Sequence, residues 1–116
     1  MDRKSIGRLA EDVASRYLKQ HGYRMLERNF FCRLGELDIV AQQKKVIVFV
    51  EVRSARYPFF HDPLDSINPK KISHLKTAAQ VWLLKRGIEN QMLRFDIIIV
   101  MFNQGEIKIN HYKDAF

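Results

Sequence analysis

Apolar residues near the N-terminus recur every three or four positions. This spacing predicts an amphipathic helix over about residues 5–21. Ser5 suits the N-cap position, and Gly22 suits the position just after the helix end. The apolar positions of this stripe are Ile6, Leu9, Ala10, Val13, Ala14, Tyr17 and Leu18.

The next segment consists of apolar runs of strand length. We expect strands at "YRMLERNFF" (23–31), "GELDIVA" (35–41) and "VIVFVEVR" (46–53). The last two are separated only by "QQKK" (42–45), which predicts a hairpin. That link lacks the Gly or Asn of a tight two-residue turn.

The C-terminal half repeats the alternation of helix and strand. All three prolines lie in 57–69, which predicts a loop, and a second helix should begin after Asn68 and end before Gly87. A buried strand at 94–102, a turn, and an alternating edge strand at 107–112 follow. The order α-β-β-β-α-β-β predicts an α/β fold, a mixed β-sheet with helices packed on it.

Composition is consistent with one globular domain spanning residues 1–116. Hydrophobic residues make up 47% of the chain, which is enough for a core. The formal net charge is +7, which favours a polyanionic partner, nucleic acid before an anionic membrane. An ordinary basic protein would show the same balance.

The chain shows no feature of export. The longest apolar runs have strand length, and the N-terminus lacks the apolar region of a signal peptide. Cys32 is the only cysteine, so no internal disulfide can form. We therefore expect a cytoplasmic protein without a membrane partner.

Two ionisable residues, Glu51 and Arg53, interrupt the most apolar strand. If the link to the preceding strand has an even number of residues, Asp38 and Glu51 lie on the same side and close together. Buried carboxylates that repel each other need compensation. Either a cation such as Arg53 or a divalent metal could supply it, so a phosphodiester-cleaving site and a structural ion pair both remain open.

Each predicted helix adds candidate site residues. Glu11 stands at the edge of the apolar stripe of the first helix, where it faces either the sheet or solvent. Lys70 and Lys71 occupy the first turn of the second helix, where cations oppose the helix dipole. They either bind a phosphate or are simply solvated.

Other chemistry finds less support in the sequence. The four histidines show no zinc-type spacing, and we expect most of them at the surface. Trp82 is expected in the core. Tyr57, Phe59 and Phe60 could stack on unpaired bases, but packing is the favoured interpretation.

Several motifs together resemble a known family. "GELDIV", "VFVEVR", a lysine early in the next helix, "RFDIIIV" and the terminal "KDAF" are similar to the YraN family of small uncharacterised bacterial proteins. The resemblance covers nearly the whole chain. That family is related to the PD-(D/E)xK nucleases, which have a restriction-endonuclease-like fold, and it resembles archaeal Holliday junction resolvases.

The resemblance implies roles for individual residues. Asp38, Glu51 and the backbone carbonyl of Val52 match metal ligands, with Mg²⁺ or Mn²⁺ as the implied ion. Glu11 matches the helix glutamate found beside the metal in the resolvase branch. Glu36 and Lys71 also match motif positions; the role of Glu36 is open, and Lys71 would contact phosphate. 

The main departure is Arg53, which stands where the wider superfamily has a catalytic lysine. Arginine stays protonated, so it can hold phosphate but is a poor general base. The resemblance therefore implies a metal-dependent endonuclease acting on nucleic acid, with DNA and branched DNA as the expected substrates and a homodimer as one arrangement. The alternatives are a non-catalytic nucleic-acid-binding module with a degenerate site, or a protein-interaction domain.

Overall fold

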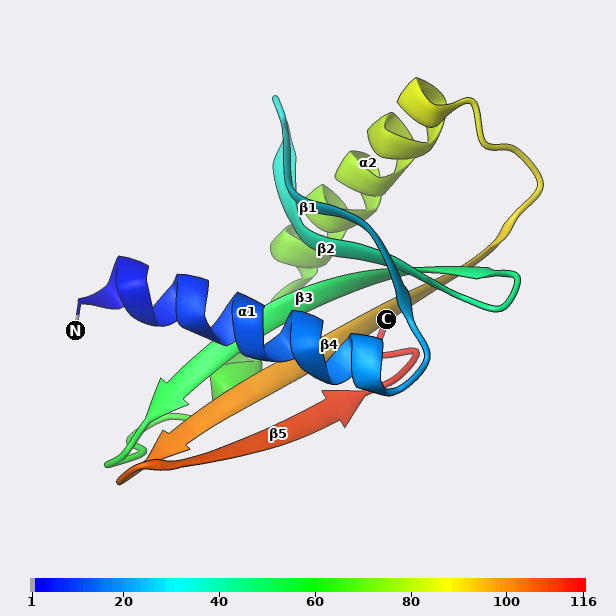
Figure 1. The fold of residues 1–116 in the computed structure, drawn as a ribbon. Coiled ribbons are helices and arrows are strands. Elements are labelled where there is room, and N and C mark those ends of the chain that lie inside the picture. The colour runs from blue at the N-terminus through cyan, green and yellow to red at the C-terminus, as the bar shows by residue number, and fades with distance from the viewer. Residues whose placement is uncertain (1) are drawn as a thin grey trace.

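The computed structural model describes residues 2–116 and contains two long helices and five strands. Figure 1 shows their arrangement. The elements are α1 (Arg3–Gln20), β1 (Arg24–Cys32), β2 (Gly35–Gln43), β3 (Val46–Arg56), the short 3₁₀ helix η1 (Pro63–Ser66), α2 (Pro69–Arg86), β4 (Met92–Asn103) and β5 (Glu106–Tyr112).

The five strands form one mixed sheet in the order β1-β2-β3-β4-β5. Neighbours pair antiparallel except β3 and β4, which are parallel because α2 connects them. The predicted element order and mixed sheet are confirmed, and so is the edge position of the strand at 107–112.

The two long helices cover opposite faces of the sheet (Figure 1). α1 buries Ala10, Ala14 and Leu18 against one face, which we call the α1 face. α2 buries a second cluster, including Leu75 and Trp82, against the other, which we call the α2 face. Burial on both faces explains why β3 and β4 are mostly apolar along their central residues, with Glu51 and Asp96 as the buried exceptions.

The ends of the elements follow from local chemistry. α2 begins as expected, because the Asn68 side chain accepts a hydrogen bond from the Lys71 N–H. It ends at Gly87, whose φ of 65° is left-handed. The prediction for α1 was wrong at its start: Asp2, not Ser5, is the N-cap, and its carboxylate accepts from the Ser5 N–H.

Gly35, at the start of β2, lies where this strand meets α2. A Cβ atom at this position would stand 2.9 Å from the carbonyl oxygen of His74. Any larger residue would push the helix away from the strand. This close approach fixes the height of α2, and therefore of Lys71, above the sheet.

Candidate active site

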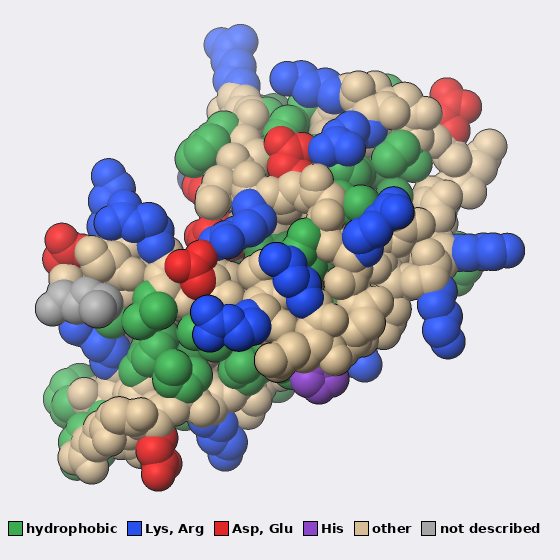
Figure 2. All heavy atoms as spheres, in the orientation of Figure 1, with side chains coloured by type: hydrophobic (Ala, Val, Ile, Leu, Met, Phe, Trp, Pro, Cys, Tyr) green, Lys and Arg blue, Asp and Glu red, His purple; other side chains and the backbone are tan. Residues whose placement is uncertain are grey.

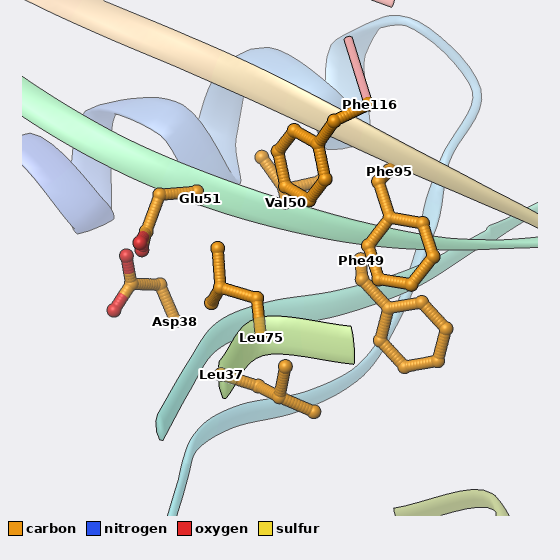
Figure 3. Close-up of a pocket in the computed structure, with 8 residues that line it drawn as sticks. All are labelled: Leu37, Asp38, Phe49, Val50, Glu51, Leu75, Phe95 and Phe116. Carbon is orange, nitrogen blue, oxygen red and sulfur yellow. The ribbon is translucent and has the colours of Figure 1, made fainter. Parts of the chain in front are cut away.

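Asp38 and Glu51 lie on the same side of the sheet. The link between β2 and β3 has two residues, Lys44 and Lys45, an even number as the prediction required. Lys44 takes the left-handed conformation that a Gly or Asn would adopt more easily (φ 55°). In Figure 3 the two carboxylates point toward each other.

The pair stands where β2 and β3 separate. The β2–β3 pairing ends at Ile39 opposite Val50, whereas β2 stays paired with β1 beyond that point. Asp38 is the next residue, and its Oδ2 accepts a hydrogen bond of 2.9 Å from the Val52 N–H. A side-chain oxygen thus replaces a backbone acceptor at the end of the ladder, which pins Asp38 beside β3.

Two cations lie beside Glu51. Its Oε2 is 3.3 Å from Nη2 of Arg53 and 3.4 Å from Nζ of Lys71. Arg53 is itself held, because its Nε donates to Oγ of Ser66 at 2.9 Å. η1 therefore orients the guanidinium, a role for Ser66 that the sequence analysis did not identify.

Glu51 is buried, with 3% of its surface exposed. Despite its two ion pairs, Oε2 has no hydrogen bond of acceptable geometry among the described residues. Buried carboxylate oxygens normally have such a partner. This oxygen is therefore electrostatically compensated but not fully coordinated.

The protonation of Asp38 reflects this crowding. Burial, followed by the adjacent Glu51 carboxyl group, raises the pKa of Asp38 to about 8, although the Val52 N–H and Arg53 oppose the shift. The Asp38 carboxyl group therefore holds its proton more tightly in the folded protein than an ordinary aspartate does. Raised carboxyl pKa values of this kind are typical of functional sites.

Glu11 and Glu36 extend the acidic group. The pKa of Glu11 is raised by burial and then by the charge of Asp38, while Asn29 and Arg28 oppose the shift. The pKa of Glu36 is raised by the same two causes in the same order, and Lys71 opposes it. The charge of Asp38 thus acts on both Glu11 and Glu36, and the Glu11 carboxylate also lies 3.7 Å from Nη2 of Arg28.

The remaining candidates contribute differently. The Val52 carbonyl, a predicted ligand, accepts a long hydrogen bond of 3.4 Å from Nη1 of Arg53. Lys70 is exposed on the first turn of α2. Within residues 2–116, no group of three His, Cys, Asp or Glu side chains is arranged to hold a metal ion.

A small cavity adjoins the carboxylates on the α2 face. Its volume is about 10 Å³, close to the minimum that admits one water molecule. Leu37, Leu75, Phe95 and Phe116 supply its apolar walls (Figure 3). These walls reduce the hydration of Asp38 and Glu51, which is the cause of the burial effect.

A second buried carboxylate, Asp96, was missed by sequence reasoning. It lies fully buried on the α1 face and accepts two hydrogen bonds of 2.9 Å from Arg94. His111 contacts it at 2.8 Å, and the Asp114 N–H donates to it at 3.0 Å. His111 is an exception to the expectation that most histidines lie at the surface, because its side chain is only 5% exposed. The lone Asp inside "FDIIIV" was the available indication.

The aromatic residues divide into two groups. Trp82 is buried as predicted and donates to Glu27 at 2.8 Å. Tyr57 and Phe60 are 54% and 81% exposed, so the favoured interpretation of packing is wrong for both. They project from the segment between β3 and η1.

Neither α1 nor α2, the long helices of the described chain, has the combination of length and apolar character needed to cross a membrane.

Comparison with known proteins gives a consistent result. The model of the uncharacterised protein family UPF0102 matches residues 10–100. A UPF0102 protein of Persephonella marina is 46% identical over 110 residues, which cover 95% of this chain and 91% of the relative. Those of Pelotomaculum thermopropionicum and Syntrophomonas wolfei are 42% and 39% identical, with 97% or more of each chain covered. The chain therefore belongs to the uncharacterised protein family UPF0102.

Proposed function

We propose that this protein is a metal-dependent nuclease of the PD-(D/E)xK type that hydrolyses phosphodiester bonds of nucleic acid. The observation that carries the proposal is the meeting of Asp38 and Glu51 at the open end of the β2–β3 ladder, beside Arg53 and Lys71. Two close carboxylates with basic side chains beside them suit a divalent cation and a phosphate diester together.

The residues present fit a divalent cation such as Mg²⁺ or Mn²⁺. Glu51 Oε2 is a buried oxygen without a hydrogen bond, and the raised pKa of Asp38 reflects burial and carboxylate crowding that a bound cation would relieve. Two carboxylates with a backbone carbonyl and waters suffice for Mg²⁺, which rarely uses an all-protein cage. Asp38, Glu51 and the Val52 carbonyl would hold the ion, with Glu11 approaching from α1. When bound, the ion supplies Lewis acidity and neutralises charge that develops on the phosphate.

The chain's own groups define the rest of the chemistry. Arg53 and Lys71 place two positive charges beside Glu51, where they would hold the phosphate and stabilise the charge of the transition state. Ser66 keeps the Arg53 guanidinium in one orientation. Since arginine does not lose its proton, Arg53 positions the substrate and does not act as a base.

The test compares cleavage of supercoiled, linear, single-stranded and four-way-junction DNA in Mg²⁺ or Mn²⁺. We expect the wild type to cut at least one substrate, and Asp38→Asn and Glu51→Gln to remain folded but lose about a hundredfold or more of the activity. Glu89→Gln is the matched control, because Glu89 is an exposed carboxylate that follows the C-terminal end of α2, whereas Lys71 lies in the first turn of that helix. Normal cutting by Asp38→Asn would refute the site.

The same assay separates the nuclease from a binding module. A degenerate site predicts salt-sensitive binding without turnover in either metal, because lysines and arginines still displace counterions. Binding by the wild type, with no cleavage of any of the four substrates, would favour that alternative.

A further inference from the structure

An open groove of about 460 Å³ lies near the C-terminal end of β3. Phe59, Phe60 and His61 form one wall, and Ile99, Met101 and Tyr112 from β4 and β5 form the other. α2 does not reach this part of the sheet, since its buried residues pack against Ile47 and Phe49 further back on β3. The groove is therefore an uncovered continuation of the α2 face.

Strand register connects the groove to the carboxylate pair. Glu51 is opposite Ile97, which is opposite Tyr112, so a residue of the site and a residue of the groove stand in one row. Arg53 heads the next row, opposite Ile99. Residues directly opposite one another share a face, and two residues along a strand span about 6.6 Å. A phosphate at Glu51 would therefore have its neighbouring nucleotide at the groove.

The groove presents aromatic rings to solvent. Phe60 is 81% exposed, Tyr112 41% and Phe59 39%. Tyr57 meets Phe59 edge-on at 6.2 Å, which braces the loop, whereas Phe60 makes no ring contact within residues 2–116. Exposed rings gathered at one site usually mark a binding surface, and rings of this kind stack on nucleobases of any sequence.

Charges around the groove favour the same ligand. Arg53 lies opposite Ile99 of the lining, Lys71 contacts the same Glu51 carboxylate as Arg53, and Lys108 lies opposite Met101 of the lining. The one acidic residue of the lining, Asp62, is engaged in capping η1, where it accepts from the Leu64 N–H. The opposite, α1 face also carries scattered lysines and arginines (Figure 2), in keeping with the net charge of +7, so the cations that favour this ligand at the groove are Arg53, Lys71 and Lys108 alone. Phosphates can therefore lie along the groove while a base enters it.

We infer that this groove binds an unstacked nucleobase, so that the protein acts on nucleic acid that is single-stranded or locally unpaired beside the scissile phosphate. The location of the base relative to the scissile bond rests on the proposed nuclease function, whereas the binding of the base does not. Phe60 is the stacking residue, and Tyr112 and Phe59 flank the base. A blunt duplex offers no unstacked base and gains nothing from the groove.

The experiment measures binding in EDTA, where no cleavage occurs. The probes are a single-stranded oligonucleotide carrying 2-aminopurine, in DNA and RNA forms, and a blunt duplex DNA of equal length. Phe60→Ala should weaken binding of the preferred single strand about five- to hundredfold and abolish the fluorescence change caused by stacking, with duplex affinity unchanged. Phe60→Trp should restore both. The salt dependence of binding should stay the same in all three proteins, because no phosphate contact is lost.

The matched control is Phe31→Ala, which removes another largely exposed ring (68%, against 81% for Phe60) on β1, the opposite edge strand from β5. Equal weakening by both alanine variants, unaltered binding by Phe60→Ala, or failure of the wild type to bind either single strand would overturn the inference. This inference and the proposed nuclease function can be refuted independently of each other. If Phe60→Ala loses stacking but the wild type cuts no substrate, only the proposed nuclease function is refuted. If the wild type cuts in a way that depends on Asp38 but Phe60→Ala binds normally, only base binding by the groove is refuted.

Discussion

The two faces of the sheet treat buried carboxylates in opposite ways. On the α1 face, Asp96 is fully buried, yet Arg94, His111 and the Asp114 N–H supply a complete set of hydrogen bonds. Burial alone raises the pKa of Asp96, but these partners outweigh it and hold the pKa below its ordinary value. On the α2 face, burial and crowding prevail, and the pKa of Asp38 rises.

The difference shows that burial by itself does not decide whether the pKa of a carboxyl group rises or falls. The partners that compensate the negative charge of Asp96 are themselves held by other hydrogen bonds. His111 contacts the Tyr17 hydroxyl at 2.9 Å, and Arg94 donates to the Tyr23 hydroxyl at 2.7 Å. That network ties α1, β4 and β5 together. The Asp38–Glu51 pair lacks such completeness, which is the condition under which an external cation gains binding energy.

The largest loss of stability should come from replacing Asp96, the buried carboxylate whose hydrogen bonds are complete. Asp96→Asn removes the anion that pairs with Arg94 and contacts His111, and loss of one partner from a buried ion pair costs about 3–5 kcal/mol. Urea denaturation at pH 7 in EDTA measures the loss. Asp38→Asn is the counterpart on the other face and should cost little or stabilise the protein. A larger loss for Asp38→Asn than for Asp96→Asn would invert the comparison.

The second-largest effect should be the stabilisation of the folded protein by a divalent cation bound at the carboxylates of the α2 face. At a Mg²⁺ or Mn²⁺ concentration about 100 times the dissociation constant, the unfolding free energy of the wild type should rise by about 2.7 kcal/mol. Thermal melts with increasing metal measure this rise. Asp38→Asn and Glu51→Gln should abolish the response, while Glu89→Gln should retain it. An unchanged response in Asp38→Asn would place the cation elsewhere.

The pH dependence of stability should have opposite signs for the two carboxylates. Asp38 binds its proton more tightly in the folded protein than in the unfolded chain, where its pKa is near 3.8. The stability that this proton contributes is therefore fully present below pH 3.8 and is lost as pH rises through about 8. Asp38→Asn should therefore gain stability relative to the wild type by up to about 1.4 kcal/mol per pH unit within that range.

For Asp96 the pKa is lowered, so its stabilisation is present above pH 3.8 and is lost as pH falls below that value. Urea denaturation of the wild type and both variants in EDTA at pH 5, 6 and 7 measures the effect of Asp38, and the same measurement at pH 2, 3 and 4 measures that of Asp96. A difference between Asp38→Asn and the wild type that is constant with pH would show that Asp38 is not protonated in the folded state.

The smallest effect is a change in titration without a change in fold. Glu51→Gln removes the neighbouring carboxyl group that helps to raise the pKa of Asp38, so that pKa should fall, although burial keeps it above 3.8. A ¹³C NMR titration of the Asp38 carboxyl carbon measures the shift, with Glu89→Gln as the control. An unaltered titration would mean that burial alone acts on Asp38.

Much of the fold followed from local pattern. Apolar spacing identified both long helices and all five strands, and Asn68 and Gly87 marked the ends of α2. The side-by-side placement of Asp38 and Glu51 depended only on whether the β2–β3 link was even, because side chains alternate along a strand. The resemblance supplied the candidate residues, and the structure brings Asp38, Glu51, Arg53 and Lys71 together.

Tertiary structure alone decided how each charge is compensated. The partners of Asp96 come from β4, β5 and the residues that follow β5. Ser66 contacts Arg53 from η1. Phe60 lies exposed at a groove that α2 does not cover. Periodicity depends on neighbours a few residues apart, so it can be read along the chain. Hydrogen-bond completeness depends on groups distant in sequence that only the folded chain brings within 3 Å or so of one another.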